Sequence, residues 1–285
     1  MDVLSGVLSS SNLTSHELYE SVGPAAAAES SSATADPAII ALDTAHVLAF
    51  RSGLGNLLFT APQGSLAVED VRAFAAKAFT KENVAALGYG ISSPVLTSLI
   101  QEKLSGLPSQ GAIQSGATKY YGGEARIESH SKPALFVGYG TSTPSAGLSV
   151  LAAHLDPTPS LKWAQGTSPL SPVLPSASVR IVHETYSDGA LLGVLIQAAT
   201  VETVREAGTL AAKALKDASS IGKEGLQKAI RKAKFKAASA LEGRETFTAT
   251  IAPQVRSTNN MSRNQLIYFG IGSCSRARMF PLEVR

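Results

Sequence analysis

The stretch SVRIVHETYSDGALLGVLIQAA, residues 178–199, carries the strongest structural pattern in the chain. Two segments rich in β-branched or apolar residues, 178–186 and 190–198, flank Ser187-Asp188-Gly189, a combination typical of a β-hairpin and its turn. The second run is the most apolar part of the sequence, but Gln197 interrupts it and it is too short to cross a membrane. The pattern therefore predicts a hairpin whose second strand is buried.

Other elements are predicted around this hairpin. Two helices are expected after it, at about 201–216, with Thr200 as a plausible N-cap, and at about 221–241. Before it we expect strands at 124–129 and 133–139, a short helix at 145–154 and an extended loop with five prolines at 156–176. The Gly- and Ser-rich stretch 105–123 is predicted to be a linker between domains.

The first hundred residues predict mostly helices. Apolar residues at spacings of three and four predict a helix after Pro37 that presents Ile39, Leu42, Ala45 and Ala49 on one face and ends near Gly53. The remaining predictions are helices at 13–20, 66–79 and 94–104, a strand at 83–91, and a segment at 23–37 that is part helical and part loose.

Composition excludes several classes of protein. The chain has 285 residues, of which 44% are hydrophobic and only 16% charged, so a core can form and some surface is suited to contact other protein. The net charge of +3 is too small to indicate a nucleic-acid partner, and the single cysteine, Cys274, excludes an internal disulfide and a multi-cysteine zinc site. No Lys or Arg precedes Arg51, so we expect no secretory signal or targeting presequence in this chain.

Motifs for bound cofactors are incomplete. Gly-Tyr-Gly occurs at 88–90 and 138–140, but Ser93 and Thr143 stand where a dinucleotide-binding loop needs glycine. A P-loop and a Gly-x-Ser-x-Gly motif are absent, and no haem, flavin or iron–sulfur ligand set is present. We therefore expect no cofactor.

Three histidines lie in sequences that partly match metal-binding or catalytic motifs. HELYE, which begins at His16, has Glu20 where a zinc helix needs its second histidine, and HETYS, which begins at His183, lies on a predicted strand. His46 could pair with Asp43 three residues earlier, but no nucleophile or metal partner is visible nearby. We interpret His46 as a helix residue hydrogen-bonded to the backbone or to a neighbour.

A basic stretch runs from Lys213 to Arg244, with nine Lys or Arg and three Asp or Glu. The stretch fits either a binding site for acidic lipid or acidic protein, or an ordinary helix face exposed to solvent. The solvent-exposed face is favoured, because a basic run forms a binding site only when its charges gather on one face.

Four stretches, in this order, resemble non-catalytic fungal members of the pitrilysin and mitochondrial-processing-peptidase family: LDTAHVLAFRSGLGNLLF (42–59), VEDVRAFAAKAFTKENVAALGYGI (68–91), KYYGGEARIES (119–129) and PALFVGYGT (133–141). The resemblance covers roughly residues 10 to 255. KYYGGEAR is its most specific piece, whereas the pattern around His46, AH-x-x-AF-x-x-GLG, is shared more widely in the family.

The resemblance implies an α+β fold of the LuxS and processing-peptidase-like metallohydrolase type, with two homologous domains that each pack helices on a sheet. We expect residues 1–104 to be the C-terminal part of the first domain, 105–123 the linker, 124–255 the second domain and 256–285 an atypical tail. The first domain would lack its N-terminal half and the second its last helix and strand, as in a partial or misdelimited gene product. Such domains leave open sheet edges and apolar faces, so we expect the isolated chain to aggregate or bind a partner.

Catalytic members of this family carry His-x-x-Glu-His and a third glutamate ligand far downstream. No His-x-x-Glu-His occurs here, and the segment from Glu20 to Glu29 that could supply the third ligand cannot hold zinc with a lone carboxylate. The resemblance places His46 downstream of the zinc site. We therefore expect no enzyme activity and no catalytic, cofactor-binding or metal-binding residues.

The function that the resemblance implies is that of a non-catalytic structural core subunit of mitochondrial ubiquinol–cytochrome c reductase. Its partners would be core protein 1 and membrane-embedded subunits, and it would sit peripherally on the matrix side of the inner membrane, with no nucleic acid and no small-molecule substrate. The alternatives are a processing-peptidase-like substrate-binding subunit or another metallopeptidase of the family, and a gene-model fragment without function.

Overall fold

The structure is a computed structural model that describes residues 1–59, 66–88, 90–109, 116–128, 131–159, 166–243 and 245–251. The chain divides into two compact units, each made of separate segments. Unit 1 contains residues 1–24, 63–115 and 239–285, and unit 2 contains residues 25–62 and 116–238. The sequence-based division at 104, 123 and 255 stays a prediction, and its tail at 256–285 lies outside the described residues.

Unit 2 is built on the predicted hairpin. Strands β2 (Ala177–Thr185) and β3 (Ala190–Ala198) pair antiparallel, and the Tyr186 N–H donates to the Gly189 carbonyl at 2.8 Å to close the turn. Strand β1 (Ala134–Thr141) pairs with the other edge of β3, which gives the order β1-β3-β2. The strands expected at 133–139, 178–186 and 190–198 are confirmed, and β3 is the central strand.

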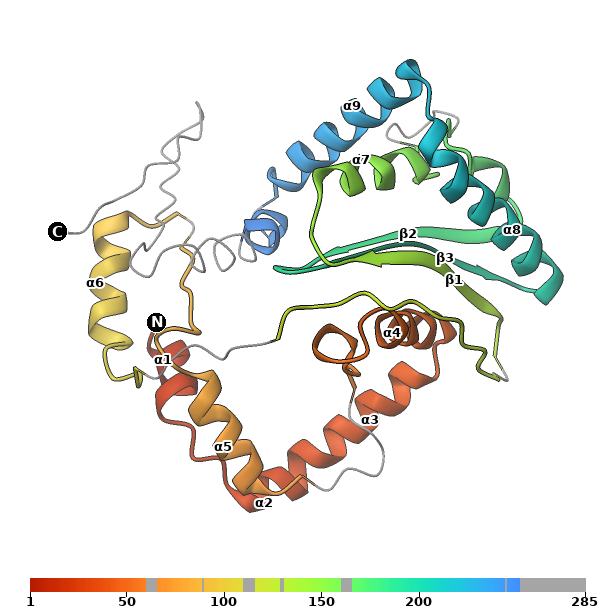
Figure 1. The fold of residues 1–285 in the computed structure, drawn as a ribbon. Coiled ribbons are helices and arrows are strands. Elements are labelled where there is room, and N and C mark those ends of the chain that lie inside the picture. Colours follow the sequence, from red (N-terminus) through yellow and green to blue (C-terminus); the bar gives the residue numbers. More distant parts are fainter. Residues whose placement is uncertain are drawn as a thin grey trace. The chain divides into compact units, whose positions relative to one another are not determined.

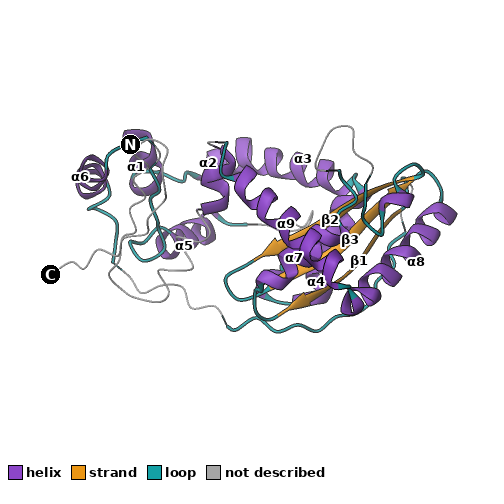
Figure 2. Ribbon diagram, turned by 90° about the horizontal axis from the view of Figure 1, so that it is seen from above, coloured by secondary structure: helices purple, strands orange, loops and turns teal. Residues whose placement is uncertain are grey.

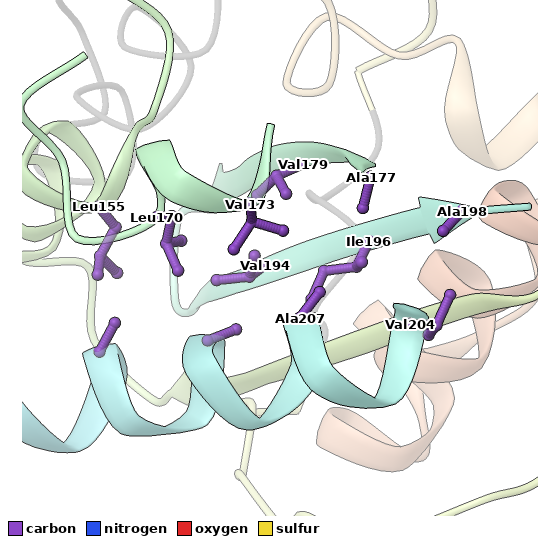
Figure 3. Close-up of a cluster of buried hydrophobic side chains, with 12 residues drawn as sticks. Leu155, Leu170, Val173, Ala177, Val179, Val194, Ile196, Ala198, Val204 and Ala207 are labelled. Atoms are coloured by element: carbon purple, nitrogen blue, oxygen red, sulfur yellow. The ribbon is translucent and has the colours of Figure 1, made fainter. Parts of the chain in front are cut away.

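Helices cover both faces of this sheet (Figure 1). Helix α4 (Pro37–Phe50) packs on one face, and α7 (Ala146–Leu155) and α8 (Val201–Asp217) pack on the other. Side chains alternate along a strand, so β3 serves both layers. Leu191 and Leu195 belong to the clusters formed with α4, whereas Val194 and Ile196 belong to the cluster that includes α8 (Figure 3). Burial on both faces explains why β3 is almost continuously apolar.

The main cluster contains twelve buried residues from four elements and a loop. Val204, Ala207, Ala211 and Ala214 line one stripe of α8, and their small side chains bring the helix close to β2 and β3. Figure 2 shows from above the three strands side by side, with α8 running along the β1 side of the sheet. Burial of this apolar surface is the main source of stability in unit 2.

Local signals set the ends of the helices in unit 2. Asp36 caps α4 by accepting from the Ala38 N–H at 2.9 Å, and Pro37 occupies the first turn. The helix ends at Phe50, and Arg51 has a positive φ of 60°, two residues before the expected glycine. Thr200 caps α8 as predicted, because its side chain accepts from the Thr203 N–H at 3.3 Å. Helices α8 and α9 (Lys223–Ala240) confirm the two predicted after the hairpin.

The segment at 23–37 is part helical and part loose, as predicted: α3 (Gly23–Thr34) is helical, whereas Ala35 and Asp36 lie outside the helices. The run of alanines favours the helix, because alanine has the highest helix propensity and loses no side-chain entropy.

Unit 1 is helical in the part of the chain that the structure describes. It contains α1 (Asp2–Ser9), α2 (Ser15–Glu17) continued by a π-helical turn at Leu18–Val22, α5 (Val68–Ala78) and α6 (Ser93–Lys103), and residues 245–251 are also helical. The helices expected at 13–20, 66–79 and 94–104 are therefore confirmed, whereas α1 was not predicted. A salt bridge of 2.9 Å between Lys103 and Asp2 joins α6 to α1.

Two predicted strands are wrong. Residues 84–88 and 124–128 have no strand structure, while Tyr89 and residues 129–130 lie outside the described ranges. A strand exists only when its backbone groups pair with another strand, and within the described residues neither segment has such a partner. The fold is nevertheless of the mixed α+β kind that the sequence predicted, with a small antiparallel sheet.

Candidate functional site

His46 is the first residue that the sequence suggested as a possible catalytic or metal-binding residue. It lies on α4, its side chain is buried, and both ring nitrogens have partners in unit 2. Nδ1 lies 2.8 Å from the Leu42 carbonyl oxygen, and Nε2 lies 2.7 Å from the Tyr186 hydroxyl. A carbonyl can only accept, so Nδ1 carries the proton and Nε2 accepts from Tyr186. The histidine therefore joins the helix to the hairpin turn.

Two surrounding features support this structural role. Burial, followed by the nearby charge of Glu184, raises the pKa of Tyr186, which keeps its hydroxyl protonated as a donor. Asp43, the expected partner of His46, instead accepts from the Leu58 N–H at 3.4 Å. With both nitrogens engaged, His46 has the hydrogen bonding that we predicted for a helix residue bonded to backbone and neighbour.

A second polar cluster, which the sequence analysis did not identify, joins α9 to the end of α7. Asp156 is only 6% exposed, and its Oδ2 binds the ammonium group of Lys236. The Lys232 ammonium donates to the backbone carbonyls of Asp156, at 2.6 Å, and Thr158, at 3.1 Å. We call Asp156, Lys232 and Lys236 the aspartate–lysine cluster.

The protonation of this cluster follows from burial and charge. Burial acts on Asp156 most strongly and opposes its ionisation, but hydrogen bonds from Lys236 and Thr158 together outweigh it, so the pKa of Asp156 is lowered. Burial lowers the pKa of Lys232, and Asp156 offsets this only in part. Burial and the Lys232 charge also lower the pKa of His154. Because its carboxylate is buried and bound, the cluster is a structural anchor rather than an acid–base pair open to a substrate.

The KYYGG stretch, the most specific piece of the family resemblance, is held against the hairpin and α4. Asp188 in the hairpin turn accepts from the Thr118 N–H at 3.2 Å and from the Thr118 hydroxyl, which lowers the pKa of Asp188. The Tyr121 N–H donates to the Ala49 carbonyl at 2.9 Å, and the Arg51 guanidinium lies 4.5 Å from the centre of the Tyr121 ring.

The Gly-Tyr-Gly sequence at 138–140 also has a packing role. Gly138 faces Gly193 across the β1–β3 pair, and a Cβ on either glycine would meet the Phe136 ring or the facing backbone. A Cβ on Gly140 would meet the rings of Tyr120 and Phe50. The space left by these glycines is filled by aromatic rings.

The remaining candidates form no metal site within the described ranges. There, no three or more His, Cys, Asp or Glu side chains gather closely enough to hold a metal ion. In the HELYE stretch, Glu17 accepts from the Thr14 backbone N–H and hydroxyl. His130 and Cys274 lie outside the described residues. Among the described helices, none is both long and apolar enough to span a membrane.

The described fold is that of an α+β protein in which the buried side chains of His46 and Asp156 are bound by other residues of unit 2. The sequence is 36% identical over 264 residues to cytochrome b-c1 complex subunit 2, mitochondrial, of Cryptococcus neoformans, an alignment that covers 89% of this chain and 61% of the relative. It is 30% identical over 261 residues to the Yarrowia lipolytica protein of that name, with 90% and 63% covered, and 35% identical over 255 residues to the Neurospora crassa protein, with 85% and 56% covered.

These matches confirm the expected resemblance: the chain is similar in sequence to fungal proteins named cytochrome b-c1 complex subunit 2. It spans about three fifths of their length. A solved structure described as complex III2 from Candida albicans with Inz-5 bound contains a chain of the same fold, with a TM-score of 0.71 and 19% identity over 90% of this chain and 64% of that one. No family model matches the sequence.

Proposed function

We propose that the chain serves as a non-catalytic structural core subunit of mitochondrial ubiquinol–cytochrome c reductase. Its role is contact with other proteins, namely core protein 1 and membrane-embedded subunits, from a peripheral position on the matrix side of the inner membrane. The proposal extends to the architecture: two homologous peptidase-like domains, divided as the sequence predicts at 104, 123 and 255.

One observation carries this proposal. Three fungal proteins named as subunit 2 of the cytochrome b-c1 complex match at 30–36% identity over 85–90% of the chain. The polar clusters support it, because His46 and Asp156 are both occupied by internal partners that tie helices to the sheet or to each other. Buried polar groups satisfied in this way stabilise a fold and offer little to a substrate.

Native electrophoresis of mitochondria, followed by detection of this chain with an antibody, tests the assembly. We expect the chain to co-migrate with ubiquinol–cytochrome c reductase and to be captured with its other subunits. Migration only as free protein, under conditions that leave the assembly intact, would contradict the proposal.

A second experiment separates the structural function from the peptidase function of the wider family. The purified chain is analysed for bound zinc and incubated with a presequence peptide, with and without a chelator. We expect no stoichiometric zinc and no cleavage, since the sequence contains no His-x-x-Glu-His motif. Cleavage that the chelator abolishes would establish an enzyme instead.

A further inference from the structure

Helix α9 carries a basic face that the proposed structural function does not use. The helix spans Lys223–Ala240 and contains six Lys or Arg residues against one acidic residue, Glu224. Two of the six, Lys232 and Lys236, belong to the aspartate–lysine cluster. The other four are exposed and point elsewhere: Lys223, Lys228, Arg231 and Lys234.

The aspartate–lysine cluster determines which side of α9 faces solvent. Lys232, Ala229 and Lys236 recur at spacings of three and four, so they mark the side that meets the end of α7. Residues on the opposite side of a helix lie about half a turn away. Arg231 and Lys234 lie on that opposite side, and Lys228 lies one turn before Lys232, at the edge of the cluster side. All three are exposed, and we call them the outward stripe.

The outward stripe combines charge with an exposed aromatic ring. Phe235 is 56% exposed and follows Lys234, four positions after Arg231. Among the described residues, one cation of the stripe has a carboxylate partner, since Lys228 binds Glu224 at 2.7 Å. A helix that presents cations together with an apolar ring fits an anionic interface that can accept both.

We propose that the outward stripe of α9 binds the surface of a membrane that contains anionic phospholipid. The lysine and arginine side chains would reach the lipid phosphates with their charged ends while their methylene groups lie along the interface. The Phe235 ring would enter the boundary between headgroups and acyl chains.

The dimensions of the stripe favour a lipid surface over an acidic protein. The helix has eighteen residues and is therefore about 27 Å long, and one face about 10 Å wide offers roughly 300 Å². A stable protein interface buries about 800 Å² on each partner. A fluid anionic surface needs no such area or fixed shape, because each Lys or Arg contributes separately to the attraction.

Vesicle flotation with the purified full-length chain tests the proposal. Vesicles of phosphatidylcholine with phosphatidylserine are compared with vesicles of phosphatidylcholine alone at low salt, and only protein bound to lipid rises in the gradient, so self-associated protein does not interfere. We expect binding to the anionic vesicles only, and a decrease in binding as salt is added.

Matched variants locate the binding surface. Arg231→Glu with Lys234→Glu should lower the bound fraction at least about tenfold, because two attractive charges become repulsive. Lys77→Glu with Lys81→Glu makes the same charge change at exposed positions in unit 1 and should leave binding nearly unchanged. Phe235→Ser should weaken the binding that persists at higher salt. Circular dichroism confirms that each variant is folded.

Three outcomes would overturn the proposal: equal binding to neutral vesicles, an equal loss in the Lys77 and Lys81 control, or no binding to anionic vesicles at low salt. A polyglutamate peptide, added in a parallel binding measurement, tests the competing partner. Binding of that peptide without binding of anionic vesicles would assign the stripe to an acidic protein.

Discussion

At the scale of single residues, the hydrogen bond between Tyr186 and His46 is the contact most open to direct test. The Tyr186 hydroxyl donates to the buried Nε2 of His46, which has no other partner within the described residues. Tyr186→Phe leaves that nitrogen unsatisfied while it keeps the ring contacts with His46 and Phe50. We expect unfolding in urea to show a loss of about 1–2 kcal/mol.

A control for this prediction is Tyr19→Phe, which removes a hydroxyl from an exposed ring. We expect it to change the free energy of unfolding by less than about 0.5 kcal/mol. An equal loss in the two variants would mean that the contact with His46 contributes nothing specific.

Gly193 allows a second prediction at this scale. A Cβ there would lie 2.3 Å from the Phe136 ring and 2.8 Å from the Val137 carbonyl, and the neighbouring strand leaves the backbone little room to move. We expect Gly193→Ala to destabilise unit 2 by about 1–3 kcal/mol through overpacking.

Thermal unfolding measures this effect. Gly222→Ala is the control, because no atom of the described residues lies within 4 Å of a Cβ at that position. If Gly193→Ala melts at the same temperature as the unchanged protein, the close approach of Phe136 is not a constraint on the sheet.

At the scale of elements, the aspartate–lysine cluster fixes α9 to the end of α7. Asp156→Asn would leave the two ammonium groups without their carboxylate. We expect a loss of about 2–3 kcal/mol near pH 7, less than for a fully enclosed ion pair because Lys236 is half exposed. Hydrogen exchange of α9 amides should accelerate in the variant.

The dependence of this loss on pH follows from the lowered pKa of Asp156. A carboxyl whose pKa is lower in the folded chain stabilises it above its unfolded pKa of 3.8, and the stabilisation disappears as the pH falls below that value. The difference between the unchanged protein and Asp156→Asn should therefore shrink below about pH 4. If the difference in stability stays constant across this range, Asp156 is not ionised as assigned. The control is Glu224→Gln, which changes an exposed carboxylate of α9.

Elements with a local signal were predictable from the sequence. β3 is apolar except at Gln197, α8 has a capping threonine, and the turn between β2 and β3 has Asp188-Gly189. The positions of these elements therefore follow from residues close in the chain. The strands expected at 83–91 and 124–129 failed because a strand also requires a distant partner. The aspartate–lysine cluster was missed for the same reason, since Asp156 and Lys236 are separated by 80 positions.

At the scale of the whole molecule, the two units differ in how well they bury their apolar side chains. Unit 2 contains all the continuous apolar clusters found in the described residues. In unit 1, α1 turns Val3, Leu4 and Val7 outward, and α5 exposes Phe74. A cavity of about 220 Å³, lined in part by Val7, Leu13 and Phe79, opens between these helices. Apolar surface of this extent marks a protein contact or a risk of aggregation.

We therefore expect the isolated chain to self-associate through unit 1. Light scattering over a concentration series should show a mass that rises with concentration, and Leu4→Ser with Phe74→Ser should reduce that rise because it removes two of the most exposed apolar side chains of the unit. Val201→Ser with Leu210→Ser makes an equivalent change on α8, where exposed apolar residues are scattered, and should have little effect. A single monomeric peak at all concentrations, together with one cooperative melting transition, would show instead that unit 1 is stable without a partner.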